Sequence, residues 1–280
     1  MLYKIEHITR YSFSKEVFLE PHTIRLHPRS DSAQTLKTFE ININPEPTGK
    51  TNLVDIGGDS SSLWFDGLTD SLTIVTTSEV ETHRSNPFDY ILSSDRAHRL
   101  PMEYRGSDES VLEPYRAPSC DFGDKFQGFV AKILLESENS TLNFLSLLNS
   151  YISVNFEHEI RDEGLAYEPE ETLSRMKGSC RDFVVLFAEV CRSMGIASRF
   201  VSGYTAGDPE NDENYLHAWA EVYLPGGGWR GYDPTLGLAV ADQHIALTSG
   251  ATPLQASPIT GSFRGTGATA EIEYEISIST

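Results

Sequence analysis

The first 85 residues alternate hydrophobic and polar positions with a period of two. In "YKIEHITRYSF", residues 3–13, aromatic and aliphatic side chains at odd positions alternate with charged and polar ones. "TFEININP" repeats the alternation at Phe39, Ile41 and Ile43, and residues 51–82 contain further apolar runs separated by Gly, Asp and Ser clusters. Several short strands with no helix between them predict a β-sandwich-like N-terminal domain, which we place with a following connector at residues 1–110.

The pattern changes to a helical period after residue 121. "DKFQGFVAKILLE" (124–136) and "STLNFLSLLNSYI" (140–152) repeat apolar residues at spacings of three and four. "EPEETLSRMKG" (168–178) has Pro and Glu in its first turn and a closing Gly, as short helices do. The apolar spacing that follows predicts a helix over 180–194, ended by Gly195.

Strands return after this helix. "ASRFVSGYT", "HAWAEVYL", "GWRGYDPT" and finally "AEIEYEISIS" all carry alternating or β-branched and aromatic residues. Helices followed by an antiparallel sheet predict an α+β domain, which we place at residues 111–280 with the closing C-terminal strands included.

Composition narrows the function classes. The 280 residues carry 41 acidic against 22 basic side chains, a formal charge of −19, so nucleic acid and anionic membranes are not expected as partners. No run approaches the roughly 20 apolar residues of a membrane-spanning helix, and "MLYKIEHITRYSF" lacks the apolar stretch of a signal peptide. We therefore expect a soluble, cytoplasmic protein. Three cysteines are too few and too scattered for a disulfide framework or a zinc finger.

Cys180 has an unusual position among these cysteines. It is the first residue of the helix predicted over 180–194, where unpaired backbone N–H groups and the helix dipole favour an anion. A thiolate is the nucleophilic form of cysteine, and the same N–H groups can hold an oxyanion. The ordinary alternative is a buried core cysteine, and Cys191, in the middle of the helix, fits that description.

A nucleophilic cysteine needs a histidine and a group that orients it. His217 opens "HAWAEVYLPGGGWRGYDPT", which predicts a β-hairpin. If residues 225–227 form a three-residue loop, Leu224 pairs with Gly228, and Asp233 falls on the face of His217 and diagonal to it. A four-residue loop would place Asp233 on the other face unless a bulge intervened. The ordinary alternative for this hairpin is a sheet edge with a surface histidine and a turn aspartate.

These stretches together resemble a known family. "GSCRDFVVLFAEVCRSMGIASRFVSGY" followed by "HAWAEVYLPGGGWRGYDPT" is similar to the core of the transglutaminase-like superfamily in its bacterial form, and the β-rich first 85 residues look like the N-terminal region of bacterial members. The resemblance implies a papain-like α+β core and acyl transfer through a thioester, without a cofactor. It assigns Cys180 as nucleophile, His217 as base and general acid, and Asp233 as the group that orients the imidazole.

The resemblance leaves the reaction open. Members of the family cross-link proteins, hydrolyse peptides or amides, or have lost the triad. This chain keeps all three residues, but Gly178-Ser179-Cys180-Arg181 departs from the Gly-Gln-Cys-Trp of animal cross-linking enzymes. We therefore expect a hydrolytic cysteine peptidase or amidase acting on a peptide or protein amide. The alternatives are a cross-linking transglutaminase, a non-catalytic protein-binding module, and a metal site on the same three side chains.

Two aromatic residues and one loop lie near the predicted site. Trp219 and Tyr204 are candidate substrate-binding residues, and core packing is the alternative for both. The acidic loop "GDPENDEN", residues 207–214, is a solvated loop or a lid over the site. It lacks the spacing of an EF-hand, so no calcium is predicted there.

Overall fold

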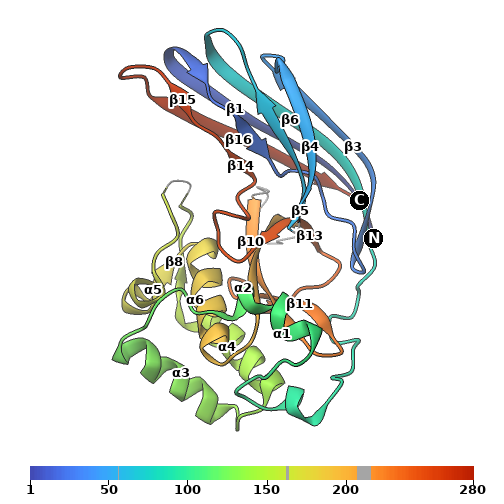
Figure 1. Cartoon of the computed structure of the whole chain (residues 1–280), viewed down its shortest axis with the longest axis vertical. Coiled ribbons are helices and arrows are strands. Elements are labelled where there is room, and N and C mark those ends of the chain that lie inside the picture. Colours follow the sequence, from blue (N-terminus) through green and yellow to red (C-terminus); the bar gives the residue numbers. More distant parts are fainter. Residues whose placement is uncertain (56, 162–163, 207–215) are drawn as a thin grey trace.

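Long antiparallel strands form one layer of the molecule, and a mixed body of helices and strands lies beneath it (Figure 1). The computed structural model describes residues 1–55, 57–161, 164–206 and 216–280. The strands of the first layer, from both ends of the chain, are β1 (Leu2–Leu19), β2 (His22–Ile24), β3 (Gln34–Asn44), β4 (Gly49–Asp55), β5 (Gly58–Trp64), β6 (Thr69–Thr82), β14 (Ile259–Thr260), β15 (Phe263–Arg264) and β16 (Ala270–Ser279).

β1 lies in the middle of a five-stranded sheet and pairs antiparallel with β6 on one side and β16 on the other. Its odd positions face inward, so that Tyr3 and Ile5 are buried while Lys4 and Glu6 are exposed. A second sheet, of four strands, has the order β14-β2-β5-β4. The period of two in the sequence therefore predicted both the strands and their buried face.

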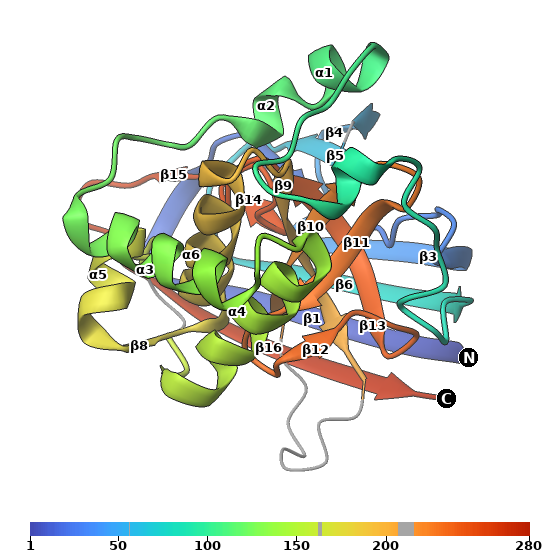
Figure 2. The ribbon, with the colours of Figure 1, turned by 90° about the horizontal axis from the view of Figure 1, so that it is seen from below.

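The closing strands of the chain were expected to belong with the core, but they pair with the N-terminal strands. β16 pairs with β1 from Lys4↔Ser279 to Phe13↔Ala270, and β14 pairs with β2. The two chain termini consequently lie side by side (Figures 1 and 2). The alternation in "AEIEYEISIS" fits any half-buried antiparallel strand, so it does not specify the partner.

The helices follow the N-terminal strands along the chain. Residues 86–121, which lie between the N-terminal strands and the long helices, contain three short helical segments and several buried side chains of the helical core, including Met102 and Tyr104. The helical segments are η1 (Asp95–His98), α1 (Ser107–Val111), α2 (Glu113–Arg116), α3 (Asp124–Glu136), α4 (Thr141–Asn155), α5 (Pro169–Arg175) and α6 (Cys180–Ser193), with the short strands β7 (Glu157–His158) and β8 (Lys177–Gly178) between the last three.

A five-stranded antiparallel sheet completes the lower body. Its order is β12-β11-β10-β9-β13. Figure 2 shows α3 to α6 gathered on one side of this sheet. The strands are β9 (Ser198–Thr205), β10 (Leu216–Leu224), β11 (Gly228–Asp233), β12 (Leu238–Ala239) and β13 (His244–Gly250).

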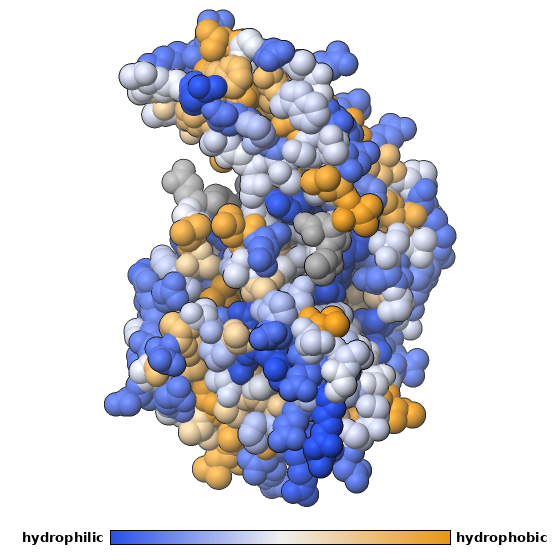
Figure 3. All heavy atoms as spheres, in the orientation of Figure 1, coloured by the Kyte–Doolittle hydropathy of each residue, from blue (hydrophilic) through white to orange (hydrophobic). Residues whose placement is uncertain are grey.

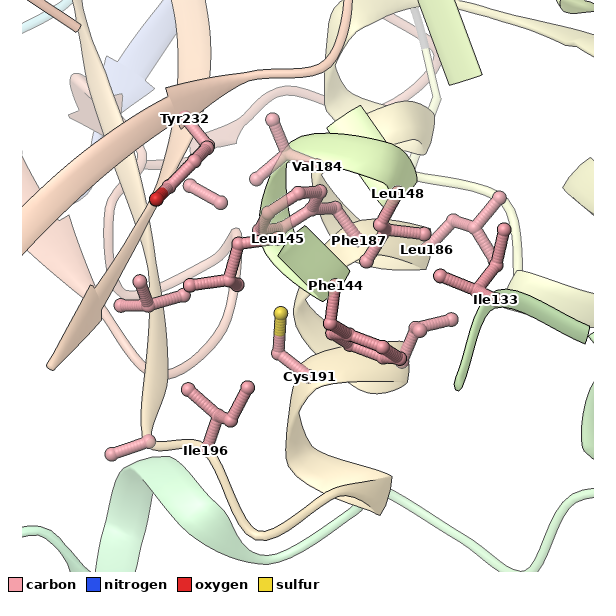
Figure 4. Close-up of a cluster of buried hydrophobic side chains, with 14 of the residues drawn as sticks. Ile133, Phe144, Leu145, Leu148, Val184, Leu186, Phe187, Cys191, Ile196 and Tyr232 are labelled. Atoms are coloured by element: carbon pink, nitrogen blue, oxygen red, sulfur yellow. The ribbon is translucent and has the colours of Figure 1, made fainter. Parts of the chain in front are cut away.

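Both faces of the core sheet are buried. On one face, alternate residues of β10 such as Ala220 and Val222 pack with α6 and α4 in a core that also holds Cys191 (Figure 4). The other face of β10 carries Trp219 and Glu221, and Glu221 accepts a hydrogen bond from Arg29 of the N-terminal part. At the end of β9, Tyr204 and Ile245 join the apolar cluster of the N-terminal strands. The sheet thus lies between the helices and the N-terminal strands, which confirms the predicted mixed α+β fold. In the described ranges, no helix is long and apolar enough to cross a membrane.

Candidate active site

Cys180 begins α6, as the sequence predicted, and its side chain is half-buried. Ser179 is the N-cap residue in extended conformation. The first backbone N–H groups of an α-helix lack the usual acceptor four residues earlier, so they and the helix dipole favour negative charge beside the sulfur. In α6 the Asp182 N–H bonds the Ser179 carbonyl at 3.0 Å. Figure 3 shows the surface hollowed between the N-terminal strands and the helical body, on the side where α6 lies.

Asp182, in the first turn of α6, holds the start of this helix in place through hydrogen bonds. Its fully buried carboxylate accepts hydrogen bonds from the N–H and hydroxyl of Ser179 at 2.7 and 2.8 Å, from the N–H of Tyr167 at 2.6 Å, and from Arg161 at 2.6 Å. Burial would raise the pKa of Asp182, but these hydrogen bonds hold it below its usual value. A Cβ on Gly178 would lie 2.9 Å from the Asp182 Cβ, which explains a glycine two residues before the cysteine.

Arg181, which stands where cross-linking enzymes have an aromatic residue, also has a structural partner. Its guanidinium donates to the carbonyl of Gly164 at 3.0 Å and to the carbonyl of Arg161. The two residues that follow Cys180 therefore both hold the chain segment before α5 against the start of α6.

The hairpin that carries the predicted histidine and aspartate has the register that a three-residue loop gives. Leu224 pairs with Gly228 and Ala220 with Tyr232, so the predicted pairing is confirmed. Asp233 then follows as the last residue of β11, on the His217 side of the hairpin. Its Oδ1 accepts the N–H groups of Thr235 and Leu236 at 2.9 and 3.1 Å, which fixes the carboxylate at the end of the strand.

The three predicted residues meet in one array. His217 Nε2 lies 2.6 Å from Asp233 Oδ2, and the Cys180 side chain is close enough to the same imidazole to help raise its pKa. Since Nε2 is bonded to the carboxylate, Nδ1 is the ring nitrogen left for the sulfur. The Asp233 side chain has 0% exposure and that of His217 15%.

The charges of this array stabilise one another. Burial alone would lower the pKa of His217, but the negative charge of Asp233 and hydrogen bonds to Asp233 and Cys180 raise it well above its usual value. Burial would likewise raise the pKa of Asp233, but His217 and a second histidine hold it well below the usual range. The arrangement therefore favours an imidazolium beside a carboxylate.

The second histidine is His244, which the sequence analysis did not select. It begins β13, and its Nε2 lies 3.1 Å from the same Asp233 Oδ2. β13 and β11 are separated in the sheet by β9 and β10, so the contact requires the sheet to curl. The sequence around His244 carries no motif that could have indicated it.

Trp219 and Tyr204, predicted as substrate-binding candidates, are both 1% exposed. The Tyr204 hydroxyl lies 2.8 Å from His7 Nδ1 on β1, and the Trp219 indole packs edge-on against His244 at 5.2 Å between ring centroids. Neither side chain is therefore placed to touch a substrate, and core packing, the alternative, describes both. The sequence did not reveal that these two side chains are buried, because the alternation within β9 and β10 does not show that both faces of the sheet are covered.

The other two cysteines, possible metal ligands and the acidic loop were also considered from the sequence. Cys191 is fully buried, and burial raises the pKa of its thiol; Cys120 is exposed. Among the described residues, no group of three or more His, Cys, Asp or Glu side chains is arranged to hold a metal ion. The acidic loop 207–214 lies outside the described residues.

Family models match two regions of the chain. The model "Transglutaminase-like superfamily" matches residues 128–234, which contain the whole array from Cys180 to Asp233. The model "Bacterial transglutaminase-like N-terminal region" matches residues 3–81. Together the two regions take in more than half of the chain.

Individual relatives agree with these matches. An uncharacterized protein of Mycobacterium bovis is 25% identical over 279 residues, covering 92% of this chain and 86% of its own length. One of Mycobacterium leprae is 37% identical over 106 residues, but the match spans only 37% of that protein. The crystal structure of a "Putative Cysteine Protease from Cytophaga hutchinsonii" has a TM-score of 0.73 at 19% identity, covering 99% of this chain and 90% of that one. This likeness shows a common fold.

Proposed function

Because the chain belongs to the transglutaminase-like superfamily, we propose that it is a thiol-dependent acyl-transfer enzyme that cleaves peptide or amide bonds through a thioester on Cys180. The observation that carries the proposal is the array of Cys180, His217 and Asp233 at the start of α6. A chain that had kept the fold only for binding would have no need of a buried carboxylate aligned on an imidazole beside a thiol.

The first half of the reaction forms the thioester. The Cys180 thiolate attacks the amide carbonyl carbon, and the carbonyl π electrons move to oxygen, where the first-turn N–H of Cys180 can donate to the oxyanion. As the tetrahedral intermediate collapses, the C–N bond breaks and the His217 imidazolium gives its Nδ1 proton to the leaving nitrogen. The amine departs and the acyl group stays on sulfur.

The second half releases the acyl group. His217, now neutral, takes a proton from water as the water oxygen attacks the thioester carbonyl. The C–S bond then breaks, the carboxylic acid leaves, and the thiolate–imidazolium pair is restored. Asp233 remains ionised throughout and keeps Nε2 engaged, so that Nδ1 faces the sulfur in both halves.

We propose water rather than an amine as the ordinary acceptor. The aromatic residue next to the nucleophile in cross-linking enzymes is absent, and Arg181 in its place bonds the backbone of the preceding segment. The substrate class is therefore a peptide or protein amide, and the product a free acid.

A panel of peptide amides, incubated with and without an added primary amine, tests this function. We expect free acid to form in both conditions, with loss of all turnover in Cys180→Ala. Cys191→Ala, which removes a thiol of the core far from the array, should keep turnover if it folds. Acyl transfer to the amine alone would replace hydrolysis with cross-linking, and turnover by Cys180→Ala would overturn the proposal.

A further inference from the structure

The Asp233 carboxylate binds two imidazoles at one oxygen. Oδ2 lies 2.6 Å from His217 Nε2 and 3.1 Å from His244 Nε2. Oδ1 accepts two backbone N–H groups of the following turn. Each carboxylate oxygen thus has two hydrogen-bond partners, so the carboxylate cannot rotate without losing hydrogen bonds.

The tautomer of His244 follows from its surroundings. A buried ionised carboxylate only accepts hydrogen bonds, so His244 Nε2 must carry a proton and donate it. His244 Nδ1 is buried and has no hydrogen-bond partner among the described residues. The hydrogen bond from Nε2 to Asp233 is therefore the contact that fixes the orientation of this ring.

The ring is held in this position by packing. The His244 side chain is 4% exposed and stands edge-on to the Trp219 indole, at 5.2 Å between centroids. Gly203, which pairs with His217 across β9 and β10, leaves room for that indole, because a Cβ there would lie 2.4 Å from Trp219 Cη2. His244 and His217 ring centroids are 6.4 Å apart, so the two imidazoles do not touch directly.

We propose that His244 is a positioning residue of the reaction: by donating to Asp233 Oδ2 it orients the carboxylate and shares its charge with His217. This inference rests on the proposed function. His244 touches neither sulfur nor substrate, and it acts only through Asp233. The titratable side chain that bonds His244 is Asp233, and the His217 ring lies 6.4 Å from it between centroids.

Loss of the His244 hydrogen bond should change the proton affinity of His217 in one direction. When a donor to Oδ2 is lost, more of the Asp233 negative charge falls on His217, so the imidazolium becomes more stable. An imidazolium that holds its proton more tightly is a weaker general acid toward the leaving nitrogen. Losing His244 should therefore extend the imidazolium form to higher pH while slowing amide cleavage.

The test compares His244→Phe with His244→Gln. Phenylalanine keeps the ring against Trp219 but removes the donor, whereas the glutamine amide can place an N–H near the position of Nε2. Peptide mass spectrometry follows the rate of Cys180 alkylation by iodoacetate across pH. This anionic reagent reacts fastest while the thiolate is paired with a charged imidazole, so the basic limb of the profile reports the loss of the His217 proton.

We expect the basic limb to move up by about one pH unit in His244→Phe and to stay near the native position in His244→Gln. The turnover number for a peptide amide should fall about tenfold in His244→Phe with little change in KM, and recover in His244→Gln. Asp233→Asn should move the limb the other way. If the phenylalanine variant does not fold, His244→Leu takes its place as the variant without a donor.

Superimposable profiles for the native chain and the apolar variant would overturn the inference, as would equal shifts in the glutamine and apolar variants. These results differ from a failure of the proposed function, in which the native chain itself would show no enhanced reaction at Cys180.

Discussion

Asp182 is the single side chain on which the position of the nucleophile most depends. It bonds both the N–H and the hydroxyl of Ser179, the residue before Cys180, and it reaches Tyr167 and Arg161 in the preceding segment. The carboxylate is wholly buried, so its charge is compensated only by these donors. The cost of changing it should appear both in stability and in the reactivity of the thiol.

Asp182→Ala should lower the free energy of unfolding by about 3 kcal/mol, because it leaves Arg161 and the Ser179 N–H without their acceptor. Urea unfolding measures this loss. Alkylation of Cys180 in the folded variant should also slow, since the N-cap loosens. Glu171→Ala, which removes an exposed carboxylate paired with Arg175, is the control and should change stability by less than about 0.5 kcal/mol. Equal effects of the two substitutions would contradict this account.

At the same scale, the sequence predicted part of the array and not the rest. Cys180 could be selected because a helix start favours a thiolate, and Asp233 because counting through a hairpin loop places it beside His217. His244 could not, because its contact with Asp233 comes from the curl of the sheet across two intervening strands. No local pattern encodes that curl.

Among the elements, the core sheet depends on a close approach at Gly203. A Cβ at this position would lie 2.2 Å from the Ile245 carbonyl oxygen on β13 and 2.4 Å from the Trp219 ring on β10. The glycine therefore lets β13 pair with β9 while the indole lies across the strand. This packing brings His244 to the site.

Gly203→Ala should destabilise the chain by about 3 kcal/mol, since neither a backbone oxygen nor a buried indole can move aside. The matched control is Gly128→Ala within α3, where a Cβ meets nothing within 4 Å. That change should stabilise the helix by about 0.5–1 kcal/mol. Thermal unfolding of both variants gives the comparison, and a neutral Gly203→Ala would show that the strands can separate without cost.

The elements themselves were largely predictable. The spacing of apolar residues predicted a helix over 180–194, and α6 spans Cys180–Ser193. The hairpin was also predicted, and of the two loop lengths left open by the sequence the three-residue loop is the one formed. Residues 86–121 were not predictable, because their helical turns are too short to show a period. Their buried residues pack against elements that follow much later in the chain.

Across the whole molecule, a buried charge cluster joins the N-terminal strands to the core sheet. Glu221 on β10 accepts from Arg29 at 2.7 Å and from Arg199 at 2.7 Å. Arg29 belongs to the segment that follows β2, so the carboxylate bridges the two parts of the chain. Nearby, the Gln34 side chain makes two hydrogen bonds to the backbone of Ala246 on β13.

Glu221 should make the stability of the molecule depend on pH. Burial would raise its pKa, but Arg199 and Arg29 lower it to about 2, whereas the unfolded carboxyl titrates near 4.5. Because the pKa of Glu221 is lower in the folded than in the unfolded state, its ionised carboxylate stabilises the fold above about pH 4.5. This contribution is lost as the pH falls toward 2. We expect about 3 kcal/mol of stability to disappear over that interval. The free energy of unfolding of Glu221→Gln, measured in urea, should depend less on pH over this interval than that of the native chain. An unchanged pH dependence would exclude the charge cluster as its source.

The sequence could not predict which distant strands pair across the whole molecule, because alternation alone does not specify an antiparallel partner.

The pairing of the closing strands with β1 and β2 has a consequence for the predicted division at residue 110. A chain of residues 111–280 would lose the β1 and β2 partners of its closing strands and expose Tyr204 and Ile245, which pack in the apolar cluster of the N-terminal strands. We expect this fragment not to unfold cooperatively, as measured by circular dichroism during heating. A sharp transition like that of the full chain would support an independent core.

The most direct test of the central claim compares two cysteines within one molecule. Cys120 is exposed and Cys180 is half-buried beside His217, so accessibility alone favours Cys120. At pH 6, where most ordinary thiols are protonated, we expect iodoacetamide to modify Cys180 at least about tenfold faster than Cys120, and His217→Ala to remove the difference. Faster modification of Cys120 in the native chain, or an unchanged rate at Cys180 in His217→Ala, would contradict the claim that this array makes Cys180 a nucleophile.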